Sequence, residues 1–345
     1  MRFSLFYNFD VTPGQYVPGL FANVEAQAIR AEQLGFDSVW VAEHHFALHG
    51  RLASPLLFLA HLSALTERIR LGTAVFEAPH YHPLRLAEEA ALLDVLSKGR
   101  LRLGIGSGAK NKPAEFEAFQ IPVAEKAACT REVVSILHQA FRTGHVSYTG
   151  QYYQFDSVAI DPCTLQPPDS LIEIAASGST LEWAGVQGYR LLVPRVGSAA
   201  DHVEWIGRYR SACGVPSGEV ALLRFVFAAK TERKAQEQTS AAFARYAQLD
   251  CGVDWDQRTD SAGYVALKQR MNMVIGTPTQ IVQQLTAWQA EYGCDEIICQ
   301  TFAAGIDHEH ALRSIELLGS EVLPELQSSS ASGTQHRVHS ELQAD

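Results

Sequence analysis

Short β-forming runs alternate with amphipathic helical stretches along almost the whole of this 345-residue chain. Each run is rich in Val, Ile, Leu and Phe, whereas the stretch after it repeats its apolar residues at helical spacing. Such strict alternation favours a parallel sheet with a helix behind each strand. The expected strands are Phe3 to Tyr7, Ser38 to Ala42, Ile69 to Phe76, Leu101 to Ile105, Leu171 to Ala175, Arg190 to Val193, Ala221 to Ala229 and Glu296 to Thr301.

The helical stretches and the length of the chain together predict a closed barrel. Eight strand and helix units indicate an α/β fold of the (β/α)₈ TIM-barrel type, which usually takes ~250 residues and carries any extra length in insertions. The insertions are expected after strands 4 and 7. The expected helices are Val24 to Leu34, Pro55 to Leu65, Leu84 to Leu96, Glu132 to Phe141, Leu181 to Gln187, Val203 to Arg210, Ala235 to Tyr246 and Thr279 to Glu291.

Both insertions have features of their own. Residues 107–161 contain a helical pattern and a hairpin pattern turned around Gly150. The second insertion, Leu249 to Met273, is long and polar, and long loops over a barrel mouth often act as lids. We expect one barrel domain over residues 1–326. Residues 327–345 have few apolar side chains to pack and are expected to form a disordered tail.

Composition limits the classes of function. A formal net charge of −10 without a concentrated run of Lys and Arg argues against a nucleic-acid partner. No apolar run is long enough to cross a membrane, and the N-terminus does not read as a secretion signal. The six cysteines are scattered without a Cys-x-x-Cys pair, as is typical of reduced thiols. We therefore expect a cytoplasmic protein without a metal centre.

Reactive residues of a barrel of this kind lie where its strands end. The second expected strand leads into Glu43, His44, His45 and Phe46. Side chains alternate along a strand, so only one of the two adjacent histidines can face the barrel mouth, and a Glu-His-His run is a poor metal site. A lone histidine is more often a core or surface residue, but its place at a strand end makes one of the pair a candidate acid or base.

Glycines mark the end of the fourth expected strand. Gly104, Gly106 and Ala109 match the dinucleotide-binding pattern G-x-G-x-x-[GA]. No helix opens directly after them and three strand and helix units precede them, so the structural context of that pattern is missing. Glycine at a strand end has a simpler use, which is to let a flat ring system approach the backbone closely.

The fifth expected strand leads into Ser177, Gly178, Ser179 and Thr180, directly before a helical stretch. Hydroxyl groups, free backbone N–H groups and the dipole of a helix N-terminus suit a phosphate group. An ordinary Ser or Thr N-cap explains the same residues equally well. The turn by itself therefore leaves both interpretations open.

Three segments taken together resemble the bacterial luciferase-like flavin-dependent monooxygenase family. They follow the order found in the family, and the resemblance covers the chain from Met1 to about Leu326. The segments are Ala42 to Phe46, His82 to Glu89 continuing through Leu93 to Gly106, and Ala176 to Thr180 with Glu182 to Ala184.

The resemblance implies a (β/α)₈ barrel that binds FMN, received as FMNH₂ from a separate flavin reductase. It implies reaction with O₂ to a flavin C4a-hydroperoxide, which oxidises a small organic substrate such as an aldehyde, a ketone or a secondary metabolite. It also implies a homodimer. The family's catalytic histidine maps onto His44. The bend that carries its flavin ring, often with a non-prolyl cis peptide, maps onto Ala74 and Val75, beside Gly106.

The resemblance also assigns the flavin phosphate. The family's phosphate-binding Ser and Thr map onto Ser177 and Thr180, on either side of Gly178 and Ser179. Many relatives carry a phosphate-binding Arg where this chain has Ser107, and Lys126 stands where a second Arg is usual. Lysine gives a point charge without the bidentate fork of arginine. The other candidates for this charge are Lys110 and Lys112.

Two alternatives remain within the superfamily. Some members use the deazaflavin F420 and transfer a hydride without oxygen, and in heterodimeric luciferases one subunit supports its partner without catalysis. The presence of His44 and of the hydroxyl turn argues against a non-catalytic subunit. Light-emitting subunits carry a Cys at the place of Gly106 and an acidic residue at that of Ala176, so bright luminescence is not expected.

Overall fold

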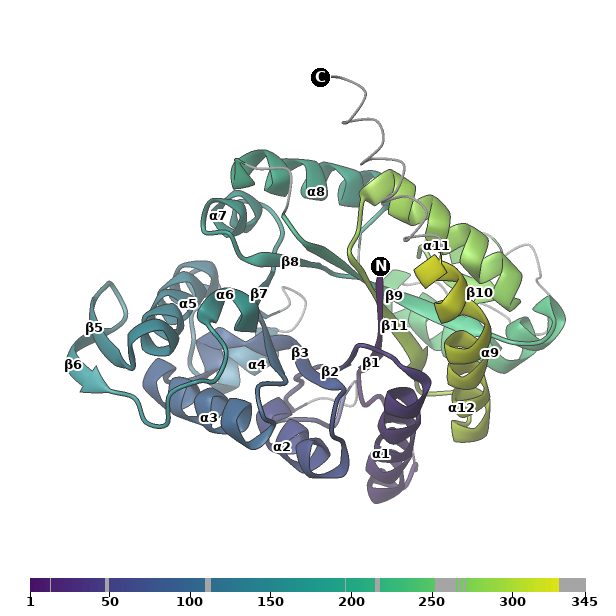
Figure 1. Ribbon diagram of the computed structural model, residues 1–345, viewed down its shortest axis with the longest axis horizontal. Helices are drawn as coiled ribbons and strands as arrows, with labels where there is room; N and C mark the ends of the chain where they lie inside the picture. Colours follow the sequence, from purple (N-terminus) through teal and green to yellow (C-terminus); the bar gives the residue numbers. More distant parts are fainter. Residues whose placement is uncertain are drawn as a thin grey trace.

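A closed barrel of eight parallel strands forms the centre of the computed structural model, which describes residues 1–12, 14–46, 50–108, 113–195, 197–214, 218–251, 265, 268–269 and 271–328 (Figure 1). The strands follow one another in chain order around the barrel, and β8 pairs with β9 to close it. The barrel strands are β1 (Arg2–Tyr7), β2 (Ser38–Val41), β3 (Arg70–Glu77), β4 (Leu101–Gly106), β7 (Ile172–Ala175), β8 (Arg190–Val193), β9 (Val220–Ala228) and β11 (Glu296–Phe302). The predicted TIM barrel is confirmed.

Helices surround the barrel, as Figure 1 shows. They begin where local chemistry favours it: Ser198 and Thr277 each form a capping box at the start of a helix, and Pro at the first turn opens several others. The helices with barrel-type connections are α1 (Val17–Leu34), α2 (Pro55–Leu65), α3 (Pro83–Leu96), α5 (Lys126–Thr143), α7 (Thr180–Val186), α8 (Ala199–Cys213), α9 (Glu232–Cys251), α11 (Pro278–Tyr292) and α12 (His308–Leu317).

The insertion after β4 has the expected helix and hairpin. Short α4 (Pro113–Ala118) precedes α5, and the antiparallel strands β5 (His145–Thr149) and β6 (Gln154–Ala159) form the hairpin. The sequence pattern predicts that the second arm starts at Tyr152, but β6 starts two residues later. The reason is that Glu132 holds the backbone N–H groups of Gln151, Tyr152 and Tyr153 in the turn. A further short helix, α6 (Pro168–Leu171), leads into β7.

The region after α9 contains a strand that the sequence did not indicate. Strand β10 (Val274–Gly276) pairs in parallel with the end of β9, outside the barrel ring. The predicted lid, Leu249 to Met273, lies mostly outside the described residues. So does the predicted tail, apart from Gln327 and Ser328, which end a helical segment that follows the π-helical turn η2 (Leu318–Val322).

An ion network fills the N-terminal end of the barrel. The fully buried guanidinium of Arg102 on β4 donates to Glu173 on β7 at 2.7 Å and to Glu296 on β11 at 2.7 Å. Glu296 also accepts from Ser4 at 2.6 Å and from the indole of Trp40 at 3.1 Å. One cation thus joins strands from different sides of the barrel.

Above this network the lumen is apolar. A cluster of buried side chains fills it, and small residues allow the strands to come close. A Cβ at Gly72 would lie 2.2 Å from the Trp40 ring, and one at Gly104 would lie 2.0 Å from the carbonyl oxygen of Thr73. The cluster consists of Phe6, Trp40, Ala42, Leu192, Ala221 and Ile298, with Ala74, Val75, Ala175 and Leu223 packed against it.

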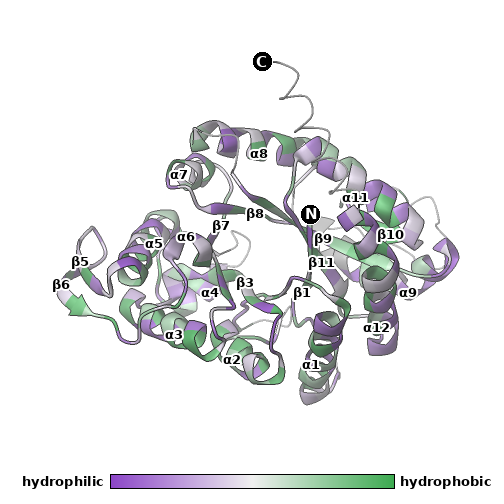
Figure 2. Ribbon diagram, in the orientation of Figure 1, coloured by the Kyte–Doolittle hydropathy of each residue, from purple (hydrophilic) through white to green (hydrophobic). Residues whose placement is uncertain are grey.

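Helices α2 and α3 carry exposed apolar side chains on the outer surface. Figure 2 colours most of α2 as hydrophobic, and Leu57 on that helix is 74% exposed. On the neighbouring α3, Leu92 and Leu96 are 48% and 56% exposed. Among the described residues, no helix has the length and apolar character needed to cross a membrane. The five cysteines whose side chains the structure describes are free thiols, as expected. They are Cys129, Cys163, Cys213, Cys294 and Cys299.

Candidate active site

His44 lies at the carboxyl end of the barrel, three residues beyond the end of β2. Its Nε2 lies 2.6 Å from Oδ1 of Asn8, just beyond the end of β1, and its backbone N–H donates to Leu52 at 3.0 Å. Gly50 packs directly on the ring, since a Cβ there would lie 2.1 Å from Cδ2 of His44. The imidazole is therefore held from two sides while remaining half-buried.

His45 has entirely different partners. Its Nε2 lies 2.6 Å from Oε1 of Glu43, and its ring lies edge-on to His80 and Phe119. The two histidines diverge as expected, but the reason is loop geometry, because β2 ends at Val41 and neither residue belongs to the strand. The sequence signal was correct about their separation and wrong about its cause.

Glu43 is the centre of a buried polar cluster. Besides His45, it accepts hydrogen bonds from the backbone N–H of Glu77 at 2.9 Å and from the hydroxyl of Tyr81 at 2.9 Å. Glu43, His45 and His80 bring possible ligand atoms within 4.8 Å of one another. Three protein donors already converge on the Glu43 carboxylate, so we assign the cluster as a hydrogen-bonded brace and not as a metal centre. It ties the loop after β2 to the end of β3.

The bend in β3 has the backbone feature that the resemblance implied. The peptide bond between Ala74 and Val75 is cis, and the pairing of β3 with β4 shifts register between Thr73 and Phe76. Both Ala74 and Val75 pack against the apolar lumen cluster. Gly106 at the end of β4 faces this bend, and a Cβ there would lie only 2.7 Å from Cγ2 of Val75. Only glycine leaves Val75 its present position.

The turn from Ser177 to Thr180 follows β7 and opens α7. Its first three residues are exposed, and Gly178 adopts a left-handed φ of +60° with open space where a Cβ would be. No side chain caps the helix, so the hydroxyl groups of Ser177 and Ser179 are not used as an N-cap. Arg208 on α8 braces the turn by donating to the carbonyl of Gly178 at 2.9 Å.

Two further residues, Ser107 and Lys126, are expected near the phosphate, and Ser107 directly follows β4. Lys126 starts α5, is buried, and donates to the carbonyl of Gly108 at 2.5 Å while lying over the Phe116 ring. It therefore holds the backbone of Gly108, the residue directly after Ser107. Lys110 and Lys112 lie outside the described residues.

Sequence reasoning did not identify Asn8, Gly50 or Arg208. Asn8 and Arg208 contact residues that lie 36 and 30 positions away in the chain, and Gly50 contacts the nearby His44 ring; no local pattern indicates such contacts. The carboxyl ends of neighbouring strands meet at one face of a barrel, so the polar Asn8 directly after β1 was the one available signal.

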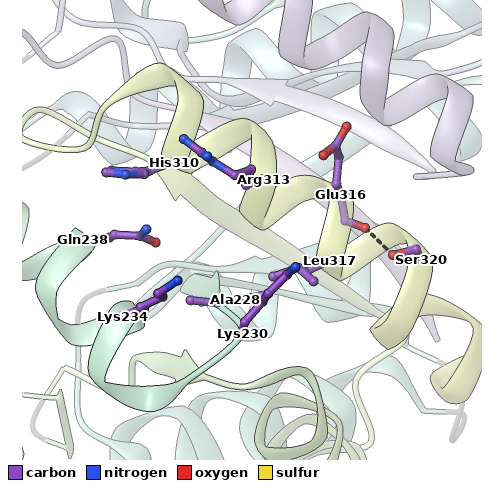
Figure 3. Close-up of a pocket in the computed structure, with 10 residues that line it drawn as sticks. Ala228, Lys230, Lys234, Gln238, His310, Arg313, Glu316, Leu317 and Ser320 are labelled. Atoms are coloured by element: carbon purple, nitrogen blue, oxygen red, sulfur yellow. Dashed lines mark hydrogen bonds between the residues drawn. The ribbon is translucent and has the colours of Figure 1, made fainter.

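A separate pocket of about 670 Å³ lies between α9 and α12 (Figure 3). Lys230, Lys234 and Arg313 line it, and its carboxylate, Glu316, pairs with Arg30 of α1 at 3.1 Å. The pocket is thus cationic. Its lysines are exposed to solvent, and none of the predicted site residues lines it.

Known proteins resemble this chain along most of its length. The family model described as luciferase-like monooxygenase matches residues 1–307. The chain is 33% identical over 325 residues to the uncharacterized protein y4vJ of Sinorhizobium fredii, covering 88% of this chain and 91% of that protein. It is 28% identical over 345 residues to the oxygenase component of a flavin-dependent trigonelline monooxygenase of Acinetobacter baylyi, covering 94% and 95%.

Solved structures share the fold. Monooxygenase RslO1 of Streptomyces bottropensis superposes with a TM-score of 0.86 at 25% identity, over 94% of this chain and 100% of that one. The oxygenating constituent of 3,6-diketocamphane monooxygenase of Pseudomonas putida, in complex with FMN, gives 0.75 at 20% identity, over 94% and 98%. An F420-dependent reductase of Methanopyrus kandleri gives 0.71 at 21% identity, over 94% and 98%.

The barrel, the bend at its third strand and the match to the family model over most of the chain define the class. This protein belongs to the luciferase-like monooxygenase family. Within it, the chain is a flavin-dependent monooxygenase.

Proposed function

We propose that this protein is the oxygenase component of a two-component system that uses FMNH₂ from a separate flavin reductase, together with O₂, to oxidise a small organic substrate. One observation carries the proposal. Three predicted parts of the site lie toward the carboxyl ends of parallel barrel strands, and therefore at one face of the barrel. They are His44 after β2, the bend at Ala74 and Val75 in the second half of β3, and the turn from Ser177 to Thr180 after β7. The oxygenase component of the trigonelline monooxygenase, similar along its whole length, supports the two-component arrangement.

The turn from Ser177 to Thr180 fits a phosphate group. Ser177, Gly178 and Ser179 are exposed, and a Cβ at Gly178 would meet nothing within 4 Å, which leaves room for a ligand. Arg208 adds a cation next to the turn, although Glu182 and Glu204 share its charge. This donor set is the kind that phosphate oxygens require, so we assign the FMN phosphate to Ser177, Gly178, Ser179 and Thr180.

The bend in β3 fits a flat ring. Ala74 and Val75 present small apolar side chains beside Gly106, close to the lumen cluster. Bound FMNH₂ would supply the electrons that activate O₂. The residues of the chain would hold the ring, exclude water around it and place His44 to give or accept a proton. We assign Ser107 and Lys126 to this side of the site, because Lys126 bonds the carbonyl of Gly108, directly after Ser107.

Cofactor titration tests the proposal directly. We expect the protein to bind FMNH₂ and, with a flavin reductase and O₂, to convert one of a panel of aldehydes, ketones and larger ring compounds. The F420-dependent reductase shares the fold, so reduced F420 is the necessary comparison. Tight binding of reduced F420 with no dependence of product on O₂ would replace our proposal by hydride transfer.

Loss of the phosphate contacts gives the first specific prediction. Thr180→Ala and Ser177→Ala should each weaken FMNH₂ binding by about 1–3 kcal/mol, the usual cost of removing one partner of a buried hydrogen bond. Fluorescence quenching under anaerobic conditions measures the affinity. Ser170→Ala, on short helix α6 before the same strand, is the matched control. If both site variants bind as tightly as the wild type, the phosphate lies elsewhere.

We also propose a homodimer that buries the apolar face of α2 and α3. The exposed Leu57, Leu92 and Leu96 support this, because large exposed apolar side chains on neighbouring helices are typical of contact surfaces. Leu57→Glu combined with Leu92→Glu should give a monomer in light scattering. A wild-type protein that is monomeric at high concentration contradicts the proposal.

The free thiols support a cytoplasmic location.

A further inference from the structure

Two hydrogen bonds connect three side chains at the carboxyl end of the barrel. The amide nitrogen Nδ2 of Asn8 donates to Oδ1 of Asp10 at 2.6 Å. The amide oxygen Oδ1 of Asn8 lies 2.6 Å from Nε2 of His44. Asn8 therefore stands between a carboxylate and the candidate catalytic imidazole, with one end of its amide turned to each.

The directions of these two hydrogen bonds determine where the His44 proton lies. An ionised carboxylate only accepts hydrogen bonds, so Asp10 requires the NH₂ end of the Asn8 amide. The carbonyl end then faces His44, and an amide oxygen also only accepts. Nε2 of His44 must therefore be the protonated nitrogen. In the neutral ring, the lone pair belongs to Nδ1.

We infer that Asn8 is a positioning residue, which holds His44 in the Nε2-protonated tautomer and so places the basic lone pair of the neutral ring on Nδ1. This inference rests on the proposed role of His44. It differs from a carboxylate that bonds a catalytic histidine directly, because the amide between Asp10 and His44 carries no charge and does not stabilise the imidazolium as a carboxylate would.

An amide is also a barrier to proton transfer. Passing a proton from His44 to Asp10 through Asn8 would require the amide to become an imidic acid, a far less stable form. The Nε2 proton consequently stays on the ring. Asp10, which also lines a pocket of about 430 Å³ between the loops after β1 and β11, orients Asn8 without taking the proton.

The surroundings keep the ring in this orientation. Gly50 lies against it, and a Cβ there would also lie 2.9 Å from the carbonyl oxygen of Asn8. Among the described residues of the same loop, Glu43 and His45 are bonded to each other, and Glu43 also accepts from Tyr81. The carboxylate of Asp10 acts on His44 through Asn8.

Nitrogen NMR of protein labelled with ¹⁵N-histidine tests the tautomer without any cofactor. We expect the wild type, above the pKa of His44, to show a protonated Nε2 and an unprotonated Nδ1, with His44→Gln identifying the signals. Asn8→Leu should give a mixture of both tautomers, because it removes the acceptor. Asp10→Asn should do the same, because the Asn8 amide is then free to turn around.

The pH dependence provides the second measurement. Asn8→Asp places a carboxylate on the imidazole, which should raise the pKa of His44 while keeping Nε2 protonated. Asn23→Asp is the matched control, since Asn23 on α1 lines the same pocket as Asp10, whereas the hydrogen bond to His44 comes from Asn8. That control should leave the tautomer unchanged and shift the pKa less.

The outcomes separate this inference from the proposed function. A wild-type His44 protonated on Nδ1, or an Asn8→Leu spectrum identical to that of the wild type, overturns the inference even if the enzyme is fully active. If FMNH₂ fails to bind while the spectra are as expected, the tautomer assignment stands and the proposed function is wrong. In turnover, Asn8→Leu should lose at least about 10-fold in product formation, part of the roughly 10²- to 10⁴-fold that a positioned acid or base supplies.

Discussion

Single residues at the barrel mouth differ in function although their sequence positions are adjacent. His44 bonds the loop after β1 and contacts Gly50, whereas His45 belongs to the brace around Glu43. Under the proposed function, a substitution at His44 removes the candidate acid or base. A substitution at His45 removes a partner of a buried carboxylate, which is a matter of stability.

The two histidines should therefore give different losses when replaced. His44→Ala should bind FMNH₂ but lose on the order of 10² or more in product formation. His45→Ala should lose much less product while lowering the midpoint of thermal unfolding, because the buried Glu43 carboxylate keeps only Tyr81 and the backbone N–H of Glu77 as partners. Product must be measured directly, since NADH consumption also counts uncoupled turnover. Full product yield from His44→Ala, or a larger loss from His45→Ala, would mean that the wrong histidine has been assigned.

At the scale of elements, two neighbouring strands meet at a contact that only glycine permits. Strand β4 ends at Gly106 and β3 bends at Val75, whose Cγ2 would lie 2.7 Å from an added Cβ. The bend and the strand end are therefore a matched pair. A larger residue on β4 displaces β3 at the place where we expect the flavin ring.

Gly106→Ala should consequently weaken FMNH₂ binding by at least about 1 kcal/mol, the lower range of the cost of overpacking, with the fold retained. Gly207→Ala on α8 is the control, because a Cβ there meets nothing within 4 Å. Alanine is the better helix former by roughly 0.5–1 kcal/mol, so this control should not lose stability. Circular dichroism and flavin titration measure both effects; equal affinities in the two variants would remove Gly106 from the site.

The elements themselves were largely predictable from periodicity, since every barrel strand and every expected helix overlaps the place that the pattern indicated, whereas α12 after β11 was not among the expected helices. The errors have physical causes. Helix α1 starts at Val17 and not Val24, because Pro at its first turn opens the helix before the apolar repeat is recognisable. Strand β10 is three residues long, too short for any period. The contacts of Asn8, Lys126 and Arg208 depend on tertiary structure, which no local pattern encodes.

For the molecule as a whole, Arg102 connects strands on different sides of the barrel. It lies on β4, and its partners Ser38, Glu173 and Glu296 lie on β2, β7 and β11. Burial lowers the pKa of an arginine, but the surrounding carboxylates outweigh this and raise the pKa of Arg102. It is therefore always charged, and its removal leaves two carboxylates buried together.

Arg102→Met should lower the free energy of unfolding by about 3–5 kcal/mol, the typical cost of removing one partner from a buried ion pair. Arg85→Met is the control, because Arg85 pairs with Glu89 on the surface of α3 with its side chain 71% exposed. Exposed pairs contribute ~0–1 kcal/mol. Urea unfolding measures both variants, and similar losses would show that the network does not close the barrel.

Acid should weaken the same network. Burial alone would raise the pKa of Glu296, but Arg102, Ser4 and Arg2 together lower it below the ordinary value of 4.5. A lowered pKa in the folded state stabilises the protein above that value, and this stabilisation is lost as the pH falls through the folded-state pKa. Glu173, whose pKa burial raises, contributes with the opposite sign. Glu296→Gln should thus be less stable than wild type at pH 7 and lose less stability on acidification, whereas Glu89→Gln should match the wild type throughout.

The same network also limits the direction from which ligands reach the barrel. Side chains of Arg102, Glu173, Glu296 and Trp40 fill one end of the barrel, so in the described part of the chain a ligand can approach the lumen cluster only from the opposite end. Approach from one end only fixes the order in which ligands bind. Of any two molecules bound there together, the deeper one enters first and leaves last, so the sequence of binding and release follows from the depth of each molecule.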